Sequence, residues 1–188
     1  MQNTKITMKI KTLVKSLLIT SVLLSSLEEC VAVPTYLAGT VYDKVGKTER
    51  VDPVLLYAVS LTESALGSKK QTSPSMYAIR TPDGPLYPKT LPEAKQALAN
   101  AVAVYGHKKI DVGLMQINGQ HWKGLKNKSS LFNPFFNVTF GARILKTALS
   151  STNDRVVGIG RYHSYTDWRA KTYGSRVMAI YNNLKGLE

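Results

Sequence analysis

Residues 111–118 read DVGLMQIN, a turn that starts at Gly113 and presents two amide side chains, Gln116 and Asn118. Two further segments accompany it in a fixed order along the chain. Residues 61–64 read LTES and lie at the end of a predicted helix, and residues 161–164 read RYHS and follow a short predicted helix. The combination of the three segments, and not any one of them alone, carries the functional interpretation.

The segment 51–66 has the pattern of a helix. Asp52 is a good N-cap and Pro53 fits the first helical position, while Gly67 stands where the helix should end. Glu63 therefore lies in the last turn. Spacings of three and four residues place it on one face with Leu56, Val59 and Ser60.

The other predicted elements are mostly helical. Thr90 and Glu93 form a capping box that opens an Ala-rich helix ending at Gly106. The remaining patterns predict a hairpin over residues 77–87 with its turn at 82–84, and helices over about 133–149, 153–162 and 175–184. We therefore expect one mostly α domain with a single small β-hairpin.

Together the three segments resemble the lytic transglycosylases of the lysozyme-like (SLT) superfamily, over roughly residues 51–184. The likeness is greatest to small exported transglycosylases of conjugation, pilus and secretion machines, which also carry a DxGLMQIN-type segment. The resemblance implies an α+β lysozyme-like fold with a cleft, and a monomer. It also implies a lead segment over 33–50, the transglycosylase domain over 51–188, and an insertion at about 73–109.

The resemblance makes peptidoglycan the substrate and Glu63 the sole acid and base. Glu63 would protonate the glycosidic oxygen between N-acetylmuramic acid and N-acetylglucosamine, and would then remove a proton from the muramyl 6-hydroxyl. The product is a 1,6-anhydromuramyl end, and no water is consumed. Because an ordinary Glu titrates near 4.3, this chemistry requires burial against an apolar wall, for which Leu56, Val59 and Met115 are candidates.

The same resemblance assigns the substrate-binding residues. It places Gln116 in the cleft beside Glu63, Met115 under the sugar and the Tyr162 hydroxyl near the catalytic carboxyl. His163-Ser164 departs from the family's Asn-Ala-Gly or Tyr-Ser-Gly. The residues expected to bind substrate are Ser64, Ser73, Gly113, Met115, Gln116, Asn118 and Tyr162, with Trp122 as a sugar-stacking candidate preferred over Trp168.

Asp111 leaves two interpretations open. Glycosidases commonly use a second carboxylate, and animal-type lysozymes carry an aspartate at this place, so a muramidase that hydrolyses the same bond with Glu63 and Asp111 is a rival. Alternatively, Asp111 caps the turn that presents Gln116. No metal or other cofactor is expected, because the three histidines are scattered at 107, 121 and 163 without ligand spacing.

The N-terminus has the plan of a signal peptide. Four lysines precede an apolar stretch of eleven residues from Leu17 to Leu27, well short of a membrane span. We place cleavage after Ala32, with Met1 or Met8 as the start, and expect an exported, periplasmic protein without a transmembrane segment in its mature chain. Lipidation at Cys30 is disfavoured by the two preceding glutamates.

The chain of 188 residues carries a formal charge of +13, of which +11 remains after removal of residues 1–32. Such a charge suits anionic envelope polymers. It also leaves a third hypothesis, a basic non-catalytic binding or assembly component of a transfer or secretion machine. Nucleic acid is not an expected partner, because no DNA-binding motif or concentrated basic run accompanies the charge.

Overall fold

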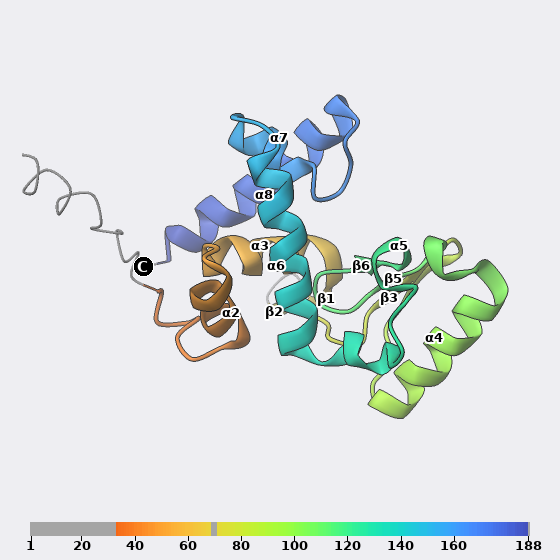
Figure 1. Ribbon diagram of the computed structural model, residues 1–188. Helices are drawn as coiled ribbons and strands as arrows, with labels where there is room; N and C mark the ends of the chain where they lie inside the picture. The colour runs from red at the N-terminus through yellow and green to blue at the C-terminus, as the bar shows by residue number, and fades with distance from the viewer. Residues whose placement is uncertain (1–32, 69–70, 188) are drawn as a thin grey trace, which may run out of the picture. The chain divides into compact units, whose positions relative to one another are not determined.

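The structure is a computed structural model that describes residues 33–68 and 71–187 (Figure 1). These residues belong to one unit, which begins at Val33. The predicted signal peptide, with Cys30, lies outside the described residues. Within the described ranges, no helix combines the length and the apolar character needed to cross a membrane.

Helices form most of the described chain. They are α2 (Val41–Glu49), α3 (Pro53–Ser64), α4 (Leu91–Tyr105), α5 (Gly119–Trp122), α6 (Pro134–Ser150), α7 (Arg155–Gly160) and α8 (Asp167–Lys185), with 3-10 turns η1 (His107–Lys109) and η2 (Lys128–Phe132). Helix α3 packs on α2 and α8, and α6 packs on α2 and α7. Figure 1 shows α3 crossing behind α6, with α4 set apart beside the strands.

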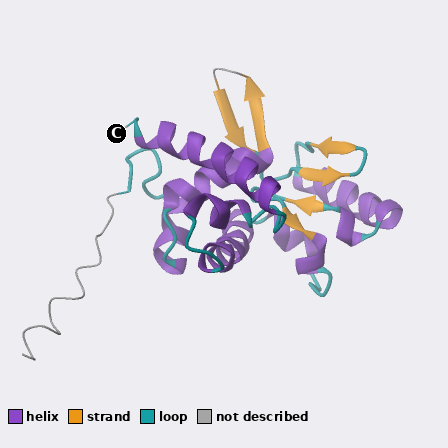
Figure 2. Cartoon of the chain, turned by 90° about the horizontal axis from the view of Figure 1, so that it is seen from above, coloured by secondary structure: helices purple, strands orange, loops and turns teal. Residues whose placement is uncertain are grey.

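The strands form two small antiparallel sheets (Figure 2). One is the hairpin of β1 (Ala65–Ser68) and β2 (Gln71–Pro74); the other has the order β4-β3-β5-β6, from β3 (Ile79–Thr81), β4 (Gly84–Leu86), β5 (Asp111–Val112) and β6 (Ile117–Asn118). In the second sheet, Arg80 pairs with Asp111, and Asp111 pairs with Asn118. The register therefore brings the DVGLMQIN segment beside the 77–87 hairpin.

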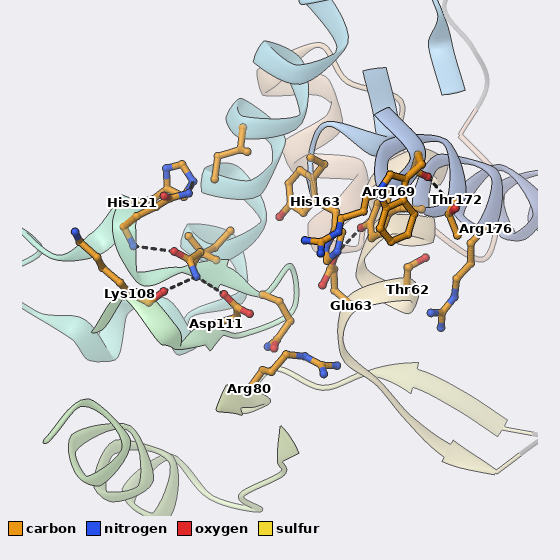
Figure 3. A pocket seen from close by; sticks show the side chains of 18 residues that line it. Thr62, Glu63, Arg80, Lys108, Asp111, His121, His163, Arg169, Thr172 and Arg176 are labelled. Atoms are coloured by element: carbon orange, nitrogen blue, oxygen red, sulfur yellow. Dashed lines mark hydrogen bonds between the residues drawn. The ribbon is translucent and has the colours of Figure 1, made fainter. Parts of the chain in front are cut away.

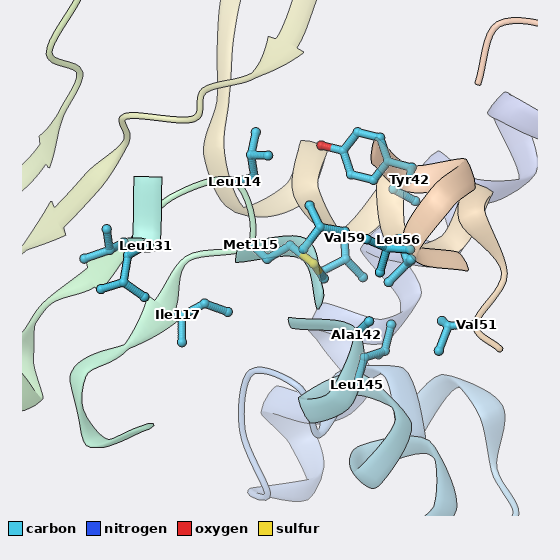
Figure 4. Packing of buried hydrophobic residues seen from close by; sticks show 14 of the residues in the cluster. Tyr42, Val51, Leu56, Val59, Leu114, Met115, Ile117, Leu131, Ala142 and Leu145 are labelled. Atoms are coloured by element: carbon cyan, nitrogen blue, oxygen red, sulfur yellow. The ribbon is translucent and has the colours of Figure 1, made fainter. Parts of the chain in front are cut away.

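The core lies where α3, α6 and the turn of residues 113–116 meet (Figure 4). Leu56 and Val59 from α3, Leu145 from α6 and Met115 from the turn are all fully buried. Gly141 makes this close packing feasible, because a Cβ at this position would lie 2.4 Å from Sδ of Met115. The functional turn is thus anchored through Met115 between two long helices.

Local sequence signals predicted most helix starts correctly. Asp52 caps α3 by accepting from the backbone N–H of Val54 at 2.8 Å. Thr90, Asn133 and Asp154 cap α4, α6 and α7 in the same way. The mostly α fold with the hairpin over residues 79–86 is confirmed.

Several boundaries and elements differ from the prediction. Helix α3 ends at Ser64, two residues before its predicted end, because strand β1 begins at Ala65 and includes Gly67. The expected lead segment 33–50 contains α2, and the strands β1, β2, β5 and β6 were not predicted. Helix α8 begins at Asp167, eight residues before the expected start, and its Gly174 packs so tightly on α7 that a Cβ would lie 2.0 Å from the Val156 carbonyl oxygen.

Candidate active site

A cavity of about 850 Å³ brings the three predicted segments together (Figure 3). Its walls are the end of α3, strands β3, β5 and β6, the turn after α7, and one face of α8. Of the predicted site residues, those that line it are Glu63, Asp111, Gln116, Asn118 and Tyr162. Figure 3 shows Glu63 and Asp111 in the middle of the cavity, between Lys108 at one end and Arg176 at the other.

A second hollow of about 610 Å³ adjoins the first. The two share His121, Ile144, Tyr162 and His163 among their lining residues. The groove therefore continues past the catalytic candidates, toward the exposed ring of Tyr165. A groove of this extent suits an extended polymer better than a small molecule.

Glu63 lies in the last turn of α3 with its carboxyl group desolvated. Burial, aided by the nearby charge of Asp111, raises its pKa from an ordinary 4.5 to about 7. A hydrogen bond from Tyr173 and the charges of Arg80 and Arg176 act in the opposite direction. A carboxyl group poised near neutrality can both give and take a proton in a single reaction cycle.

Tyr173, on α8, is the residue that contacts the Glu63 carboxyl. Its hydroxyl donates to Oε1 of Glu63 at 2.5 Å. Its ring stacks on His163, with centroids 4.9 Å apart and an interplanar angle of 4°. The stack fixes the ring and the hydrogen bond orients the carboxyl, so His163 supports Glu63 through Tyr173.

Tyr162 was expected beside the catalytic carboxyl and has a different hydrogen-bond partner. Its hydroxyl donates to the backbone carbonyl of Met115 at 2.6 Å. It still lines the cavity, and burial together with the charges of Glu63 and Asp111 raises its pKa well above 10. The Tyr162 hydroxyl thus holds the DVGLMQIN turn in place.

Asp111 occupies the middle of the cavity and is held by Asn118. The Nδ2 of Asn118 donates to Oδ1 of Asp111 at 2.7 Å and to the carbonyl of Lys108 at 3.1 Å. Desolvation raises the pKa of Asp111, and the Asn118 hydrogen bond partly opposes this. Because Oδ1 of Asn118 also accepts from the N–H of Gln120, the Asn118 amide is committed to the protein.

Gln116 lines the cavity with its backbone at a positive φ of 45°. Its Nε2 donates to the carbonyls of Ala78 and Gly113 at 3.1 and 2.9 Å. Both amide hydrogens are therefore committed to backbone carbonyls. A ligand would meet Gln116 through its Oε1 acceptor alone, and not through a donor and an acceptor as the sequence suggested.

Three predicted ligand residues are instead buried structural groups. Ser64 is 1% exposed and donates to the carbonyl of Leu114 at 2.7 Å, which ties α3 to the turn. Met115 is fully buried under Gly141. Gly113, at φ 84°, makes room for Asn137, since a Cβ there would lie 2.2 Å from its Nδ2.

Ser73 and Trp122 also lie outside the cavity lining. Ser73 is exposed in β2, opposite Leu66 of β1. Trp122 is 1% exposed, and its Nε1 donates to the carbonyl of Ile117 at 2.8 Å. The tryptophan that lines the cavity is Trp168, which is 65% exposed, so the structure reverses the preference between the two.

The cavity also contains residues that the sequence did not indicate. Tyr173 is described above; the others include Thr62, Arg80, Lys108, Arg169, Thr172 and Arg176. Residues 169, 172, 173 and 176 follow helical spacing on one face of α8. This stripe would have been recognisable had the helix been predicted from residue 167.

Metal ligation has no evident site in the described ranges: no group of three or more His, Cys, Asp or Glu side chains there could hold an ion. His121 and His163 both line the cavity, but the structure groups neither with enough further ligands.

Comparisons with known proteins agree with this geometry. The family profile described as "Transglycosylase SLT domain" matches residues 40–183. Two curated relatives, both named "Invasion protein IagB", from Salmonella typhimurium strains SL1344 and LT2, are each 30% identical over 106 residues, which is 50% of this chain and 66% of the relative. The chain thus spans just under two thirds of these relatives. No solved structure gives a significant match.

Proposed function

The chain belongs to the transglycosylase SLT domain family, whose members are lytic transglycosylases, lyases that act on peptidoglycan, and from this premise we propose that it cleaves peptidoglycan with Glu63 as its acid and base. The bond cut is the β-1,4 linkage between N-acetylmuramic acid and N-acetylglucosamine. The observation that carries the proposal is the desolvated Glu63 carboxyl, with a pKa raised to about 7, inside the cavity that the three motif segments line.

The reaction needs one proton, delivered and then recovered. Protonated Glu63 donates to the glycosidic oxygen as the bond from C1 of the muramyl residue breaks, which leaves Glu63 as a carboxylate. The carboxylate then accepts the proton of the muramyl 6-hydroxyl, whose oxygen bonds to C1. The products are a 1,6-anhydromuramyl end and a free N-acetylglucosamine 4-hydroxyl, and Glu63 is protonated again.

The surroundings of Glu63 support both halves of this cycle. Burial favours the neutral acid that starts the reaction, whereas the hydrogen bond from Tyr173 stabilises the carboxylate that forms during it. Because the Tyr173 ring stacks on His163, the donor is positioned before substrate arrives. The exposed indole of Trp168 offers a face on which a sugar ring could stack.

A muramidase is the second candidate, and Asp111 is the observation that favours it. Asp111 lines the same cavity as Glu63, and its charge contributes to the raised Glu63 pKa. In a retaining hydrolase this carboxylate would stabilise or attack C1, and water would complete the reaction. Against this role, Asp111 has a raised pKa and is tethered through Oδ1 to Asn118.

Digestion of purified sacculi by the mature chain distinguishes the two reactions. We expect products that end in 1,6-anhydromuramic acid, identified by mass spectrometry, and loss of activity in Glu63→Gln. Asp111→Asn, which keeps a side chain of the same size, should still form anhydro ends. Reducing muramic acid ends that depend on Asp111 would support the muramidase instead. Full activity of Glu63→Gln would exclude both enzymes.

The cellular role that we propose is local opening of the wall for a transfer or secretion apparatus, by an exported, periplasmic protein. The relatives named as invasion proteins and the basic charge of the chain support this role. A strain that carries Glu63→Gln in place of the natural gene should lose transfer or secretion. Intact transfer or secretion in that strain would instead favour the non-catalytic assembly role, and cell fractionation tests the location.

A further inference from the structure

The cavity around Glu63 is unusually rich in positive charge. Among the residues that the structure describes, the Lys and Arg side chains that line it are Arg80, Lys108, Arg169 and Arg176. Its carboxyl groups, Glu63 and Asp111, both have raised pKa values. Since these four cations outnumber the two acids, the cavity is net positive.

The carboxylates of the cavity offset only part of this charge: Arg80 lies near Glu63 and Asp111, and Arg176 lies near Glu63. None of the four side chains forms an ion pair with another described residue, and all four residues are exposed. Arg169 stacks over the ring of Trp168 at 5.2 Å from the centroid, so its charge stays at the cavity wall. An uncharged sugar chain would leave this excess of positive charge without a counter-charge in the bound state.

The cations stand on opposite walls of the cavity. Arg169 and Arg176 lie on the face of α8 that lines the cavity, while Arg80 comes from β3 and Lys108 from η1. Figure 3 shows Arg80 below Glu63, Lys108 at one end and Arg176 at the other. An anionic substituent that leaves the sugar chain on either side of the bond at Glu63 would therefore meet a cation.

We propose that Arg80, Lys108, Arg169 and Arg176 recognise the carboxylates of the peptide stems on the glycan, so that the substrate is the peptide-bearing strand and not bare glycan. This inference rests on the proposed function. The stems hang from the muramyl residue, which is the sugar that Glu63 acts on, and their free carboxylates suit the planar donors of arginine. Electrostatic capture then directs the enzyme to uncross-linked stretches whose stems keep free carboxylates.

Binding is measured on the Glu63→Gln variant, which holds strands without cutting them. The probes are un-cross-linked peptidoglycan strands with acetylated amines, the same strands after amidation of the stem carboxylates, and strands stripped of their stems. We expect the first to bind about 10-fold more tightly than the other two, and the difference to shrink when added salt shortens the screening length.

Charge-removing variants locate the recognition. In the same background, Arg80→Gln and Arg176→Gln should each lower the preference for free stem carboxylates about 3- to 10-fold, and Arg176→Lys should restore part of it. Lys171→Gln is the matched control, because Lys171 is exposed on α8 but does not line the cavity. It should keep the full preference.

The outcomes separate this inference from the proposed function. The inference is overturned if strands with free stem carboxylates and strands with amidated stems bind equally well. It is also overturned if Lys171→Gln lowers the preference for free stem carboxylates as much as Arg176→Gln does. Equal binding of stem-free and peptide-bearing strands would assign recognition to the lactyl carboxylate, and overturns it as well. Because these are binding measurements, they hold whether or not the wild-type protein forms anhydromuramyl ends, which is the separate test of the reaction.

Discussion

The phenolic oxygen of Tyr173 lies 2.5 Å from Oε1 of Glu63 and donates a hydrogen bond to it. The two residues come from α8 and α3, which are separated by most of the chain. Burial favours the neutral form of Glu63, while this bond favours the charged form, and the balance raises the pKa to about 7. The hydrogen bond therefore tempers the effect of burial on the pKa of the proposed acid and base.

Tyr173→Phe should move the pH dependence upward. In the wild-type protein, kcat/KM should fall as the pH rises through about 7, because Glu63 must begin protonated. Loss of the hydrogen bond to the carboxylate raises the pKa further, so the falling limb should shift up by about one pH unit. Tyr162→Phe is the control, since its hydroxyl binds the Met115 carbonyl. If the falling limb of the pH profile did not shift in Tyr173→Phe any more than in Tyr162→Phe, the assignment of that limb to Glu63 would be contradicted.

Glu63→Gln should stabilise the fold at neutral and alkaline pH. Glu63 loses its proton near 4.5 in the unfolded chain and near 7 when folded. As the pH rises between these values the unfolded state is increasingly favoured, so the variant should gain relative stability up to about pH 7 and then level off. The gain should reach roughly 1–3 kcal/mol, because burial raises the pKa from 4.5 to about 7 and one pKa unit corresponds to about 1.4 kcal/mol.

Urea unfolding at several pH values measures this gain. Glu93→Gln should show the opposite trend, because hydrogen bonds from the Lys89 backbone and Thr90 lower the pKa of Glu93. Its wild-type contribution is present at neutral pH and disappears as the pH falls through the lowered pKa. A Glu63→Gln effect that does not change with pH would show that the carboxyl is solvated in the folded protein.

Ser64→Ala should destabilise the protein without weakening substrate binding. The Ser64 hydroxyl is buried and holds the Leu114 carbonyl, so its loss should cost about 1–3 kcal/mol in thermal or urea unfolding. KM should stay within about twofold of the wild type, as expected for a group outside the cavity lining. Ser150→Ala, which removes an exposed hydroxyl on α6, should have a smaller effect on stability. A large rise in KM would restore Ser64 as a ligand residue.

The two tryptophans should respond to mutation in opposite ways. Trp168→Ala removes an exposed ring from the cavity wall, and should raise KM several-fold, on the order of 1 kcal/mol, with little change in unfolding. Trp122→Phe removes a buried hydrogen bond to the Ile117 carbonyl, and should lower stability by about 1–3 kcal/mol while KM is kept. Steady-state kinetics and urea unfolding of both variants measure these effects. A rise in KM for Trp122→Phe together with a loss of stability for Trp168→Ala would contradict the placement of Trp168 in the cavity wall and Trp122 in the core.

Helix starts could be predicted because their causes are local. Asp52, Thr90, Asn133 and Asp154 each accept a hydrogen bond from a backbone N–H two or three residues ahead, which needs no distant partner. The start of α8 has no such signal, since Thr166 makes no side-chain cap bond there. Its first turns instead pack closely on α7, where Gly160 lies against Ala170. Because the predicted helix began only at about residue 175, the sequence did not place Tyr173 on it.

The candidate site was predicted in part for a similar reason. The resemblance to lytic transglycosylases and the analogy with glycosidases pointed to Glu63, Asp111 and Gln116, and all three line the cavity. Whether a side chain faces ligand or core depends on neighbours from other segments. Gly113 and Ser64 serve packing and not a ligand because Asn137 and the Leu114 carbonyl lie against them.

The sequence by itself was sufficient for the mostly helical class and the segment order, because capping and turn chemistry are encoded over a few residues. The proposal of Glu63 as the acid came from the resemblance of the three segments to lytic transglycosylases. The raised Glu63 pKa, the Tyr173 hydrogen bond and the cationic cavity walls depended on the tertiary fold. Each of them arises from groups on different elements, α3, β3, η1 and α8, and desolvation and charge proximity exist only once those elements pack together.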